Sequence, residues 1–162
     1  MPQGIVYKST GSWYLVKSKN NFFECRIKGK IRLKDISTTN PIAVGDEVEF
    51  QMESDGKGII SDILPRVNYI IRKSVNLSKQ YHIIASNIDI SVLVVTLNNP
   101  ITSTNFIDRF LVSCEAYDIP VIIAFNKKDT YIDKESDEIE KLINTYRTIG
   151  YKCELISAKY GD

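Results

Sequence analysis

Two short polar segments follow apolar stretches of strand length, and their residue types suit recognition of a hydrogen-bonding ligand. The tetrapeptide N-K-K-D occupies positions 126–129, directly after the apolar stretch 121–125, and S-A-K at 157–159 follows the stretch 152–156. In open α/β sheets, ligands bind beyond the carboxyl ends of the strands. A carboxylate there, such as that of Asp129, can accept two adjacent N–H donors in one forked, charge-assisted arrangement. These segments form the candidate chemical site of the chain.

The two segments resemble the guanine-recognition boxes of P-loop GTPases. Guanine presents two neighbouring donors, N1–H and the N2 amino group, whereas adenine has an acceptor at N1, so a carboxylate at Asp129 would select guanine. The resemblance implies that Asn126 contacts the other edge of the base, that the stem of Lys127 packs on the ring, and that the backbone N–H of Ala158 meets the guanine carbonyl. The guanine-binding candidates are Asn126, Lys127, Asp129, Ala158, Ser157, which would shape the loop, and Lys159, which would cover the opposite ring face.

The N-K-x-D pattern is not specific by itself, because four residues match by chance and Asn-Lys-Lys-Asp is also good turn chemistry. Three features favour the functional interpretation: the apolar strand before it, the gap of 28 residues from Asp129 to Ser157, and S-A-K after the next strand. With His82 as the only histidine, no Ser-His-Asp or Cys-His arrangement is possible. We predict no catalytic residue and no metal ligand within this chain.

The segments around this site alternate between strand and helix patterns, as in a parallel α/β sheet. Apolar stretches at 90–97, 120–125 and 152–156 predict strands, the first of them buried on both faces. Apolar residues recur at helical spacing over 104–117 and 133–149. Strand–helix–strand–helix–strand indicates part of a parallel sheet with right-handed crossovers.

The first part of the chain has a different pattern, made of short strands without helices. Strands of a few residues, spaced about ten residues apart, recur up to residue 64, which is typical of a small antiparallel barrel or sandwich. A barrel is favoured because closure removes exposed strand edges. We therefore predict an OB-fold at 1–68, a linker at 69–81, and an α/β domain at 82–162.

The charge is divided between the two parts. The net charge of the 162 residues is only +1, yet residues 1–81 hold 13 Lys+Arg against 8 Asp+Glu, and residues 82–162 hold 8 against 12. A basic module suggests a nucleic-acid partner. Trp13, Tyr14 and Phe22 are candidates either for base stacking or for the barrel core. Basic residues at every second position form a basic strip, which is either an RNA-binding surface or a solvated strand face: Arg26, Lys28, Lys30, Arg32 and Lys34.

Several protein classes are disfavoured by the sequence. No apolar run approaches the roughly 18 residues of a membrane span, and no secretory signal precedes the first strand. The three cysteines are scattered and form no C-x-x-C, which disfavours a disulfide scaffold and a closed zinc site. We expect a cytoplasmic protein without a membrane partner.

A phosphate loop is missing from the 162 residues. A P-loop GTPase requires G-x-x-x-x-G-K-[ST], and the only G-K pairs, at 29–30 and 56–57, lack both the first glycine and the following Ser or Thr. In the usual order this loop precedes N-K-x-D. Either the chain is no GTPase, or the order is permuted and the loop follows residue 162.

Further motifs complete a resemblance to the circularly permuted, ribosome small-subunit-dependent GTPases, the RsgA/YjeQ family. They are C-R-I-K-G-K-I-R at 25–32, N-P at 40–41, V-G-D at 44–46, P-R at 65–66 with Arg72, N-I-D at 87–89 and I-D-R at 107–109.

The resemblance implies an OB-fold that binds ribosomal RNA, then the first part of a permuted GTPase sheet, with the phosphate loop, switches and a zinc-binding tail beyond residue 162. It implies GTP or GDP and Mg²⁺ as ligands, the small ribosomal subunit as partner, and GTP hydrolysis during late subunit maturation. We expect a monomer, and we expect the 162-residue chain to be inactive by itself. The alternative is a non-enzymatic RNA-binding OB module with a degenerate α/β partner.

Overall fold

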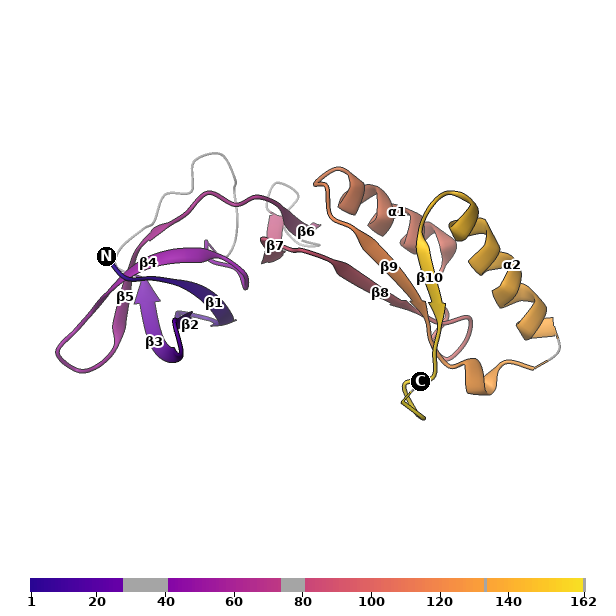
Figure 1. Cartoon of the computed structure of the whole chain (residues 1–162), viewed down its shortest axis with the longest axis horizontal. Helices are drawn as coiled ribbons and strands as arrows, with labels where there is room; N and C mark the ends of the chain where they lie inside the picture. Colours follow the sequence, from indigo (N-terminus) through magenta and orange to yellow (C-terminus); the bar gives the residue numbers. More distant parts are fainter. Residues whose placement is uncertain (28–40, 74–80, 133, 162) are drawn as a thin grey trace. The chain divides into compact units, whose positions relative to one another are not determined.

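The computed structural model describes residues 1–27, 41–73, 81–132 and 134–161 (Figure 1). The chain divides into two compact units, Met1–Ile88 and Asp89–Asp162.

The first unit contains a closed five-stranded barrel. The strand order around it is β1-β2-β3-β5-β4, and all neighbours are antiparallel except β3 and β5, which run parallel. This OB-like barrel confirms the predicted fold of the N-terminal part. Its strands are β1 (Gln3–Thr10), β2 (Trp13–Ser18), β3 (Asn21–Ile27), β4 (Glu47–Met52) and β5 (Gly58–Ile63).

Alternation along the strands builds the barrel core. On β2, Tyr14 and Val16 are buried, whereas Trp13 between the turn and Tyr14 stays exposed, as the two-residue period of a strand requires. Tyr14 therefore belongs to the core, and the candidates Trp13 and Phe22 lie on the surface. The buried cluster consists of Val6, Tyr14, Val16, Cys25, Ile42, Val48, Phe50 and Ile60.

A β-hairpin occupies much of the region predicted as a linker. Strands β6 (Tyr69–Lys73) and β7 (Tyr81–Ser86) pair antiparallel, and the boundary between compact units falls after Ile88. The predicted linker at 69–81 and domain start at 82 thus differ from the observed partition. The sequence did not reveal this hairpin because each of its strands is only five or six residues long. The pairing of two strands separated in the sequence also leaves no signal in the local composition.

A buried ionic network attaches this hairpin to the barrel. Asp46 is fully buried, and Arg66 donates from Nε and Nη2 to its two carboxylate oxygens at 2.6 Å each. The Oγ of Ser86, at the end of β7, donates to Asp46 Oδ1 at 2.5 Å, and the backbone N–H of Ala43 donates to Oδ2 at 2.8 Å. A buried charge is tolerated when it is paired and hydrogen-bonded in this way.

The second unit is a three-stranded parallel sheet with two helices. Strands β8 (Ser91–Val95), β9 (Val121–Phe125) and β10 (Lys152–Leu155) have the order β10-β9-β8. They are connected by α1 (Thr104–Glu115), and by a 3₁₀ turn η1 (Lys128–Thr130) followed by α2 (Lys134–Thr148). The predicted order of strands and helices is confirmed.

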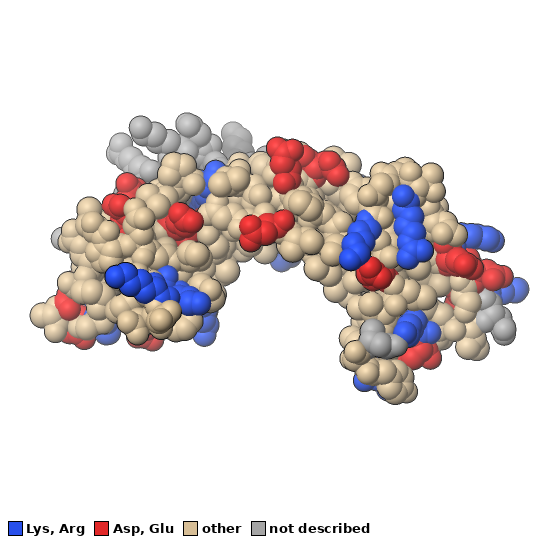
Figure 2. All heavy atoms as spheres, in the orientation of Figure 1, with Lys and Arg blue, Asp and Glu red and all other residues tan. Residues whose placement is uncertain are grey.

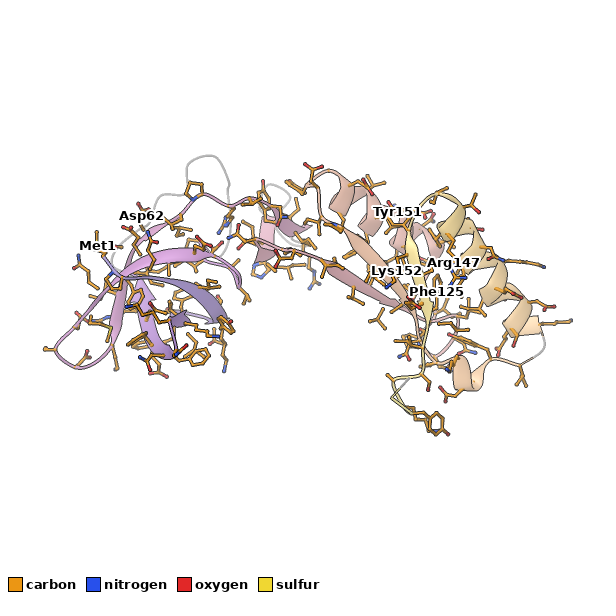
Figure 3. The ribbon with its side chains drawn as sticks, in the orientation of Figure 1. Met1, Asp62, Phe125, Arg147, Tyr151 and Lys152 are labelled. Atoms are coloured by element: carbon orange, nitrogen blue, oxygen red, sulfur yellow. The ribbon has the colours of Figure 1, made fainter. Side chains whose placement is uncertain are left out.

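Helix α2 packs against the sheet of this unit. The ring of Phe125 on β9 lies 6.5 Å from that of Tyr146 on α2, and Arg147 of α2 donates to the carbonyl of Cys153 on β10 at 2.8 Å. The side chains of Phe125 and Arg147 are labelled in Figure 3. Leu93 and Val95 of β8 are buried, but the alternate residues Val92 and Val94 are each 56% exposed. The prediction that this strand is buried on both faces is therefore wrong for the described residues.

Candidate functional site

Asn126 joins the two predicted recognition segments. It follows β9, and its backbone N–H donates to the carbonyl of Val95 at the end of β8, at 2.9 Å. Its side-chain Oδ1 accepts from the backbone N–H of Lys127 at 2.8 Å and from that of Ala158 at 3.0 Å. The carboxyl ends of β9 and β10 thus bring the N-K-x-D and S-A-K segments together, as the parallel sheet predicts.

Asp129 is held in its ionised form. The hydroxyl of Ser157, which is fully buried, donates to Asp129 Oδ1 at 2.6 Å. This hydrogen bond is the main reason that the pKa of the Asp129 carboxyl lies below its ordinary value, and the charges of Lys159 and Lys127 lower it further. The carboxylate itself is exposed, so it is an accessible acceptor at neutral pH.

The two lysines of the segments flank this carboxylate. Lys127 has a left-handed backbone, with φ of 73°, and its Nζ donates to the carbonyl of Asn99 in the loop after β8. The Nζ of Lys159 lies 4.9 Å from the ring centroid of Tyr160. Both side chains therefore have protein partners in this structure, and both contribute positive potential at Asp129.

Tyr131 supports the site and was not among the sequence candidates. Its hydroxyl donates to the carbonyl of Asn126 at 2.6 Å and accepts from the backbone N–H of Leu97 at 3.1 Å. It is buried, and burial raises its pKa above the ordinary value. The phenol thereby ties the ends of β8 and β9 together beneath the recognition segments. The only sequence signal was an aromatic residue two positions after Asp129.

The donor and acceptor set fits a base that has two adjacent N–H donors and a neighbouring carbonyl. Asp129 offers the exposed carboxylate, and the amide of Asn126, with Oδ1 engaged by the protein, retains Nδ2 as a donor. The N–H of Ala158, expected to meet the guanine carbonyl, donates here to Asn126. A base carbonyl must therefore share this N–H or take it over.

The basic strip is only partly described. Arg26 lies on β3, is exposed, and pairs with Glu53 at 2.9 Å. Exposed pairs of this kind contribute little to stability. Lys28, Lys30, Arg32 and Lys34 lie outside the described residues. Lysine and arginine side chains are seen on the surface of the barrel in Figure 2.

Three further properties concern the described residues alone. No group of three or more His, Cys, Asp or Glu among them is arranged to hold a metal ion. Neither of their helices has the length and apolar character that crossing a membrane requires. Cys25, Cys114 and Cys153 are free thiols and are buried.

Two family models match the chain and together cover nearly all of it. A family model described as "RsgA GTPase" matches residues 63–162, and one described as "RsgA N-terminal domain" matches residues 3–60. The chain belongs to the RsgA GTPase family. The predicted resemblance is thereby confirmed, including the OB-like barrel followed by α/β structure.

Close relatives of this RsgA-family chain carry the name "Small ribosomal subunit biogenesis GTPase RsgA". The protein of Christiangramia forsetii is 60% identical over 163 residues, covering 98% of this chain and 52% of the relative. That of Flavobacterium psychrophilum is 56% identical, covering 98% and 50%. The chain spans about half the length of the curated relatives it matches.

Solved structures agree with this assignment. YloQ, described as a circularly permuted GTPase, is 35% identical with a TM-score of 0.69, and the match covers 98% of this chain and 52% of YloQ. YjeQ from Thermotoga maritima is 30% identical with a TM-score of 0.74, covering 99% and 53%.

Proposed function

We propose that the protein binds and hydrolyses GTP and acts with the small ribosomal subunit during its late maturation. The observation that carries the proposal is the contact between the two recognition segments. The Ser157 hydroxyl donates to the Asp129 carboxylate and favours its ionised form, and the Ala158 backbone N–H donates to the Asn126 side chain. Relatives that are more than half identical bear the name of a subunit-biogenesis GTPase.

In this proposal the residues of the chain recognise the base. Asp129 accepts from N1–H and the N2 amino group of guanine, and Asn126 donates from Nδ2 to the opposite edge. Lys127 and Lys159 pack their stems on the two faces of the ring, which requires their ammonium groups to leave Asn99 and Tyr160 or to reach past the base. Ser157 holds the carboxylate in place.

Phosphate chemistry is assigned to none of the 162 residues. They contain no G-x-x-x-x-G-K-[ST] segment, whose backbone N–H groups, lysine and hydroxyl would hold the phosphates and Mg²⁺. Bound Mg²⁺ would neutralise charge that develops on the transferred phosphoryl group. Zinc binding stays a proposal about the family's C-terminal region.

The barrel is proposed to bind ribosomal RNA through the basic strip. Arg26 is exposed at the end of β3, where the remaining strip residues follow in sequence. Neutralisation of phosphates supplies most of such non-specific affinity. The three free, buried cysteines suit the cytoplasm, and we propose a monomer that needs no membrane partner.

The base assignment is tested by Asp129→Asn in the complete protein. An asparagine side chain offers a donor in place of one carboxylate oxygen, so GDP affinity should fall roughly 100-fold or more, and xanthosine diphosphate should become the preferred ligand. Affinities are measured by titration calorimetry. Asp137→Asn, on the exposed start of α2, is the control and should leave both affinities unchanged.

An unaltered preference of the Asp129→Asn variant for guanine nucleotides would contradict the assignment of Asp129 to base recognition. If the unsubstituted complete protein bound RNA but neither nucleotide, the alternative of an RNA-binding module with a degenerate α/β partner would replace it.

A further inference from the structure

The outward face of β1, β2 and β3 displays aromatic rings in a defined register. On β2, Tyr14 and Val16 point into the core, so Trp13 and Lys17 face outward. Across the ladder, Lys17 lies opposite Phe22 of β3, and Trp13 lies opposite Arg26. We call this surface the aromatic face: Tyr7, Trp13, Lys17, Phe22 and Lys57.

One cluster on this face combines two rings with one ammonium group. Tyr7 and Phe22 meet edge to face with centroids 5.5 Å apart, and they are 49% and 53% exposed. The Nζ of Lys17 lies 5.2 Å from the Tyr7 centroid and 5.9 Å from the Phe22 centroid. A shallow hollow of about 360 Å³, lined in part by Ile5, Tyr7 and Lys17, adjoins the Tyr7 side of this cluster.

A second cluster repeats this chemistry at the other end of β2. Trp13 is 42% exposed, and the Nζ of Lys57, from the turn before β5, lies 5.0 Å from its ring centroid. Trp13 and Lys17 are four residues apart on one strand, so the two clusters are separated by about 13 Å. Glu24, opposite Leu15, lies between them on β3 and is exposed.

We propose that the aromatic face binds unpaired RNA bases by stacking, one base on the Trp13 cluster and one on the Tyr7–Phe22 cluster. The inference rests on the proposed RNA-binding role of the barrel and identifies the ligand as single-stranded RNA. On this face an ammonium group lies over each exposed ring, so a base that stacks there displaces the ammonium group, which then neutralises the adjoining phosphate.

The charges favour RNA over an apolar protein surface. A protein partner covering these rings would remove water from Lys17 and Lys57, and a desolvated ammonium requires a compensating anion. A nucleotide strand carries that anion on every residue. Glu24 repels phosphates between the clusters, which separates the face into two discrete base sites.

The test uses the fluorescence of Trp13, the only tryptophan of the 162 residues. The probe is an oligouridylate of about six nucleotides, within the usual site size of one OB-fold. We expect saturable quenching on titration. An abasic ribose-phosphate oligomer of equal length, which has the charge without the bases, should bind at least about tenfold more weakly and should not quench.

Variants locate the binding on the aromatic face. Phe22→Ala should weaken oligouridylate binding about tenfold, and Phe22→Tyr, which keeps a ring, should restore it. Met52→Ala removes an exposed apolar side chain from β4 of the same barrel and should have no effect. Because Phe22 is half exposed, its replacement leaves the core intact.

Three results would overturn the inference. The abasic oligomer could bind as tightly as the oligouridylate, or Phe22→Ala could bind the oligouridylate as tightly as Met52→Ala does. In the third, Phe22→Ala loses subunit binding although RNA does not quench Trp13 fluorescence in the unsubstituted chain. The last result would indicate a protein partner. Subunit binding that survives Phe22→Ala and still depends on the basic strip would contradict only this inference. Failure of the Asp129→Asn test concerns the guanine site and leaves the aromatic face untouched.

Discussion

At the scale of the residue, a buried serine controls the accessible carboxylate of the base site. Ser157 is hydrogen-bonded to Asp129 at 2.6 Å and is itself fully buried, two residues after the end of β10. Its hydroxyl stabilises the charged form of Asp129 and lowers the pKa of that carboxyl. The motif residue thus depends on a partner 28 positions later in the sequence.

Replacing Ser157 with alanine should raise the pKa of Asp129 toward its ordinary value. The proton then binds at higher pH, so the ionised acceptor is lost earlier as the pH falls. The measurement is a carbon NMR titration of the Asp129 carboxyl in the 162-residue chain. Ser113→Ala, on α1 and bonded to the carbonyl of Arg109, serves as control. A titration midpoint that is the same in both variants would show that the hydroxyl does not set this pKa.

At the scale of the element, one glycine lets the β6–β7 hairpin approach the barrel. Gly45 has φ of +90°, and a Cβ at this position would lie 2.0 Å from the carbonyl oxygen of Ser86 on β7. The adjacent Val44 accepts from the backbone N–H of Ser86 at 2.9 Å. Both the left-handed conformation and the close approach therefore require glycine.

Gly45→Ala should destabilise the chain more than Gly56→Ala does. Gly56 has a similar φ of +80°, but nothing lies within 4 Å of a Cβ built there, so alanine adds only left-handed strain of about 1–2 kcal/mol. At Gly45 overpacking against Ser86 adds about 1–3 kcal/mol. Urea denaturation measures the difference, and amide exchange in β6 and β7 shows whether the hairpin detaches. Equal unfolding free energies would contradict the close approach.

At the scale of the whole molecule, two units of opposite charge carry separate proposed tasks. The barrel unit holds the basic strip and the aromatic face, and the α/β unit holds the base site. The total net charge of +1 conceals this division. None of the 162 residues forms a phosphate loop, so the proposed tasks are base recognition and RNA binding.

The 162-residue chain should hydrolyse no GTP above the rate of an Asp129→Asn sample. Catalysis of phosphoryl transfer depends on groups positioned around the phosphates and Mg²⁺, and base recognition alone supplies none. Release of phosphate is measured with and without small ribosomal subunits. Turnover by the unsubstituted chain that Asp129→Asn abolishes would overturn this expectation.

The sequence by itself determined the family and all of the strands and helices except those of the β6–β7 hairpin. Strand and helix periods are local, so β1 to β5 and the strands and helices of the α/β unit were predictable, as was the meeting of N-K-x-D and S-A-K at one sheet edge. Tertiary structure decided which aromatic residues lie inside, because Tyr14 and Trp13 are neighbours and only barrel closure defines the inner face. It also revealed the hairpin, the Asp46–Arg66 network and the support of Asn126 by Tyr131. Each of these depends on contacts between segments distant in the chain, and such contacts leave no periodic signal in the sequence.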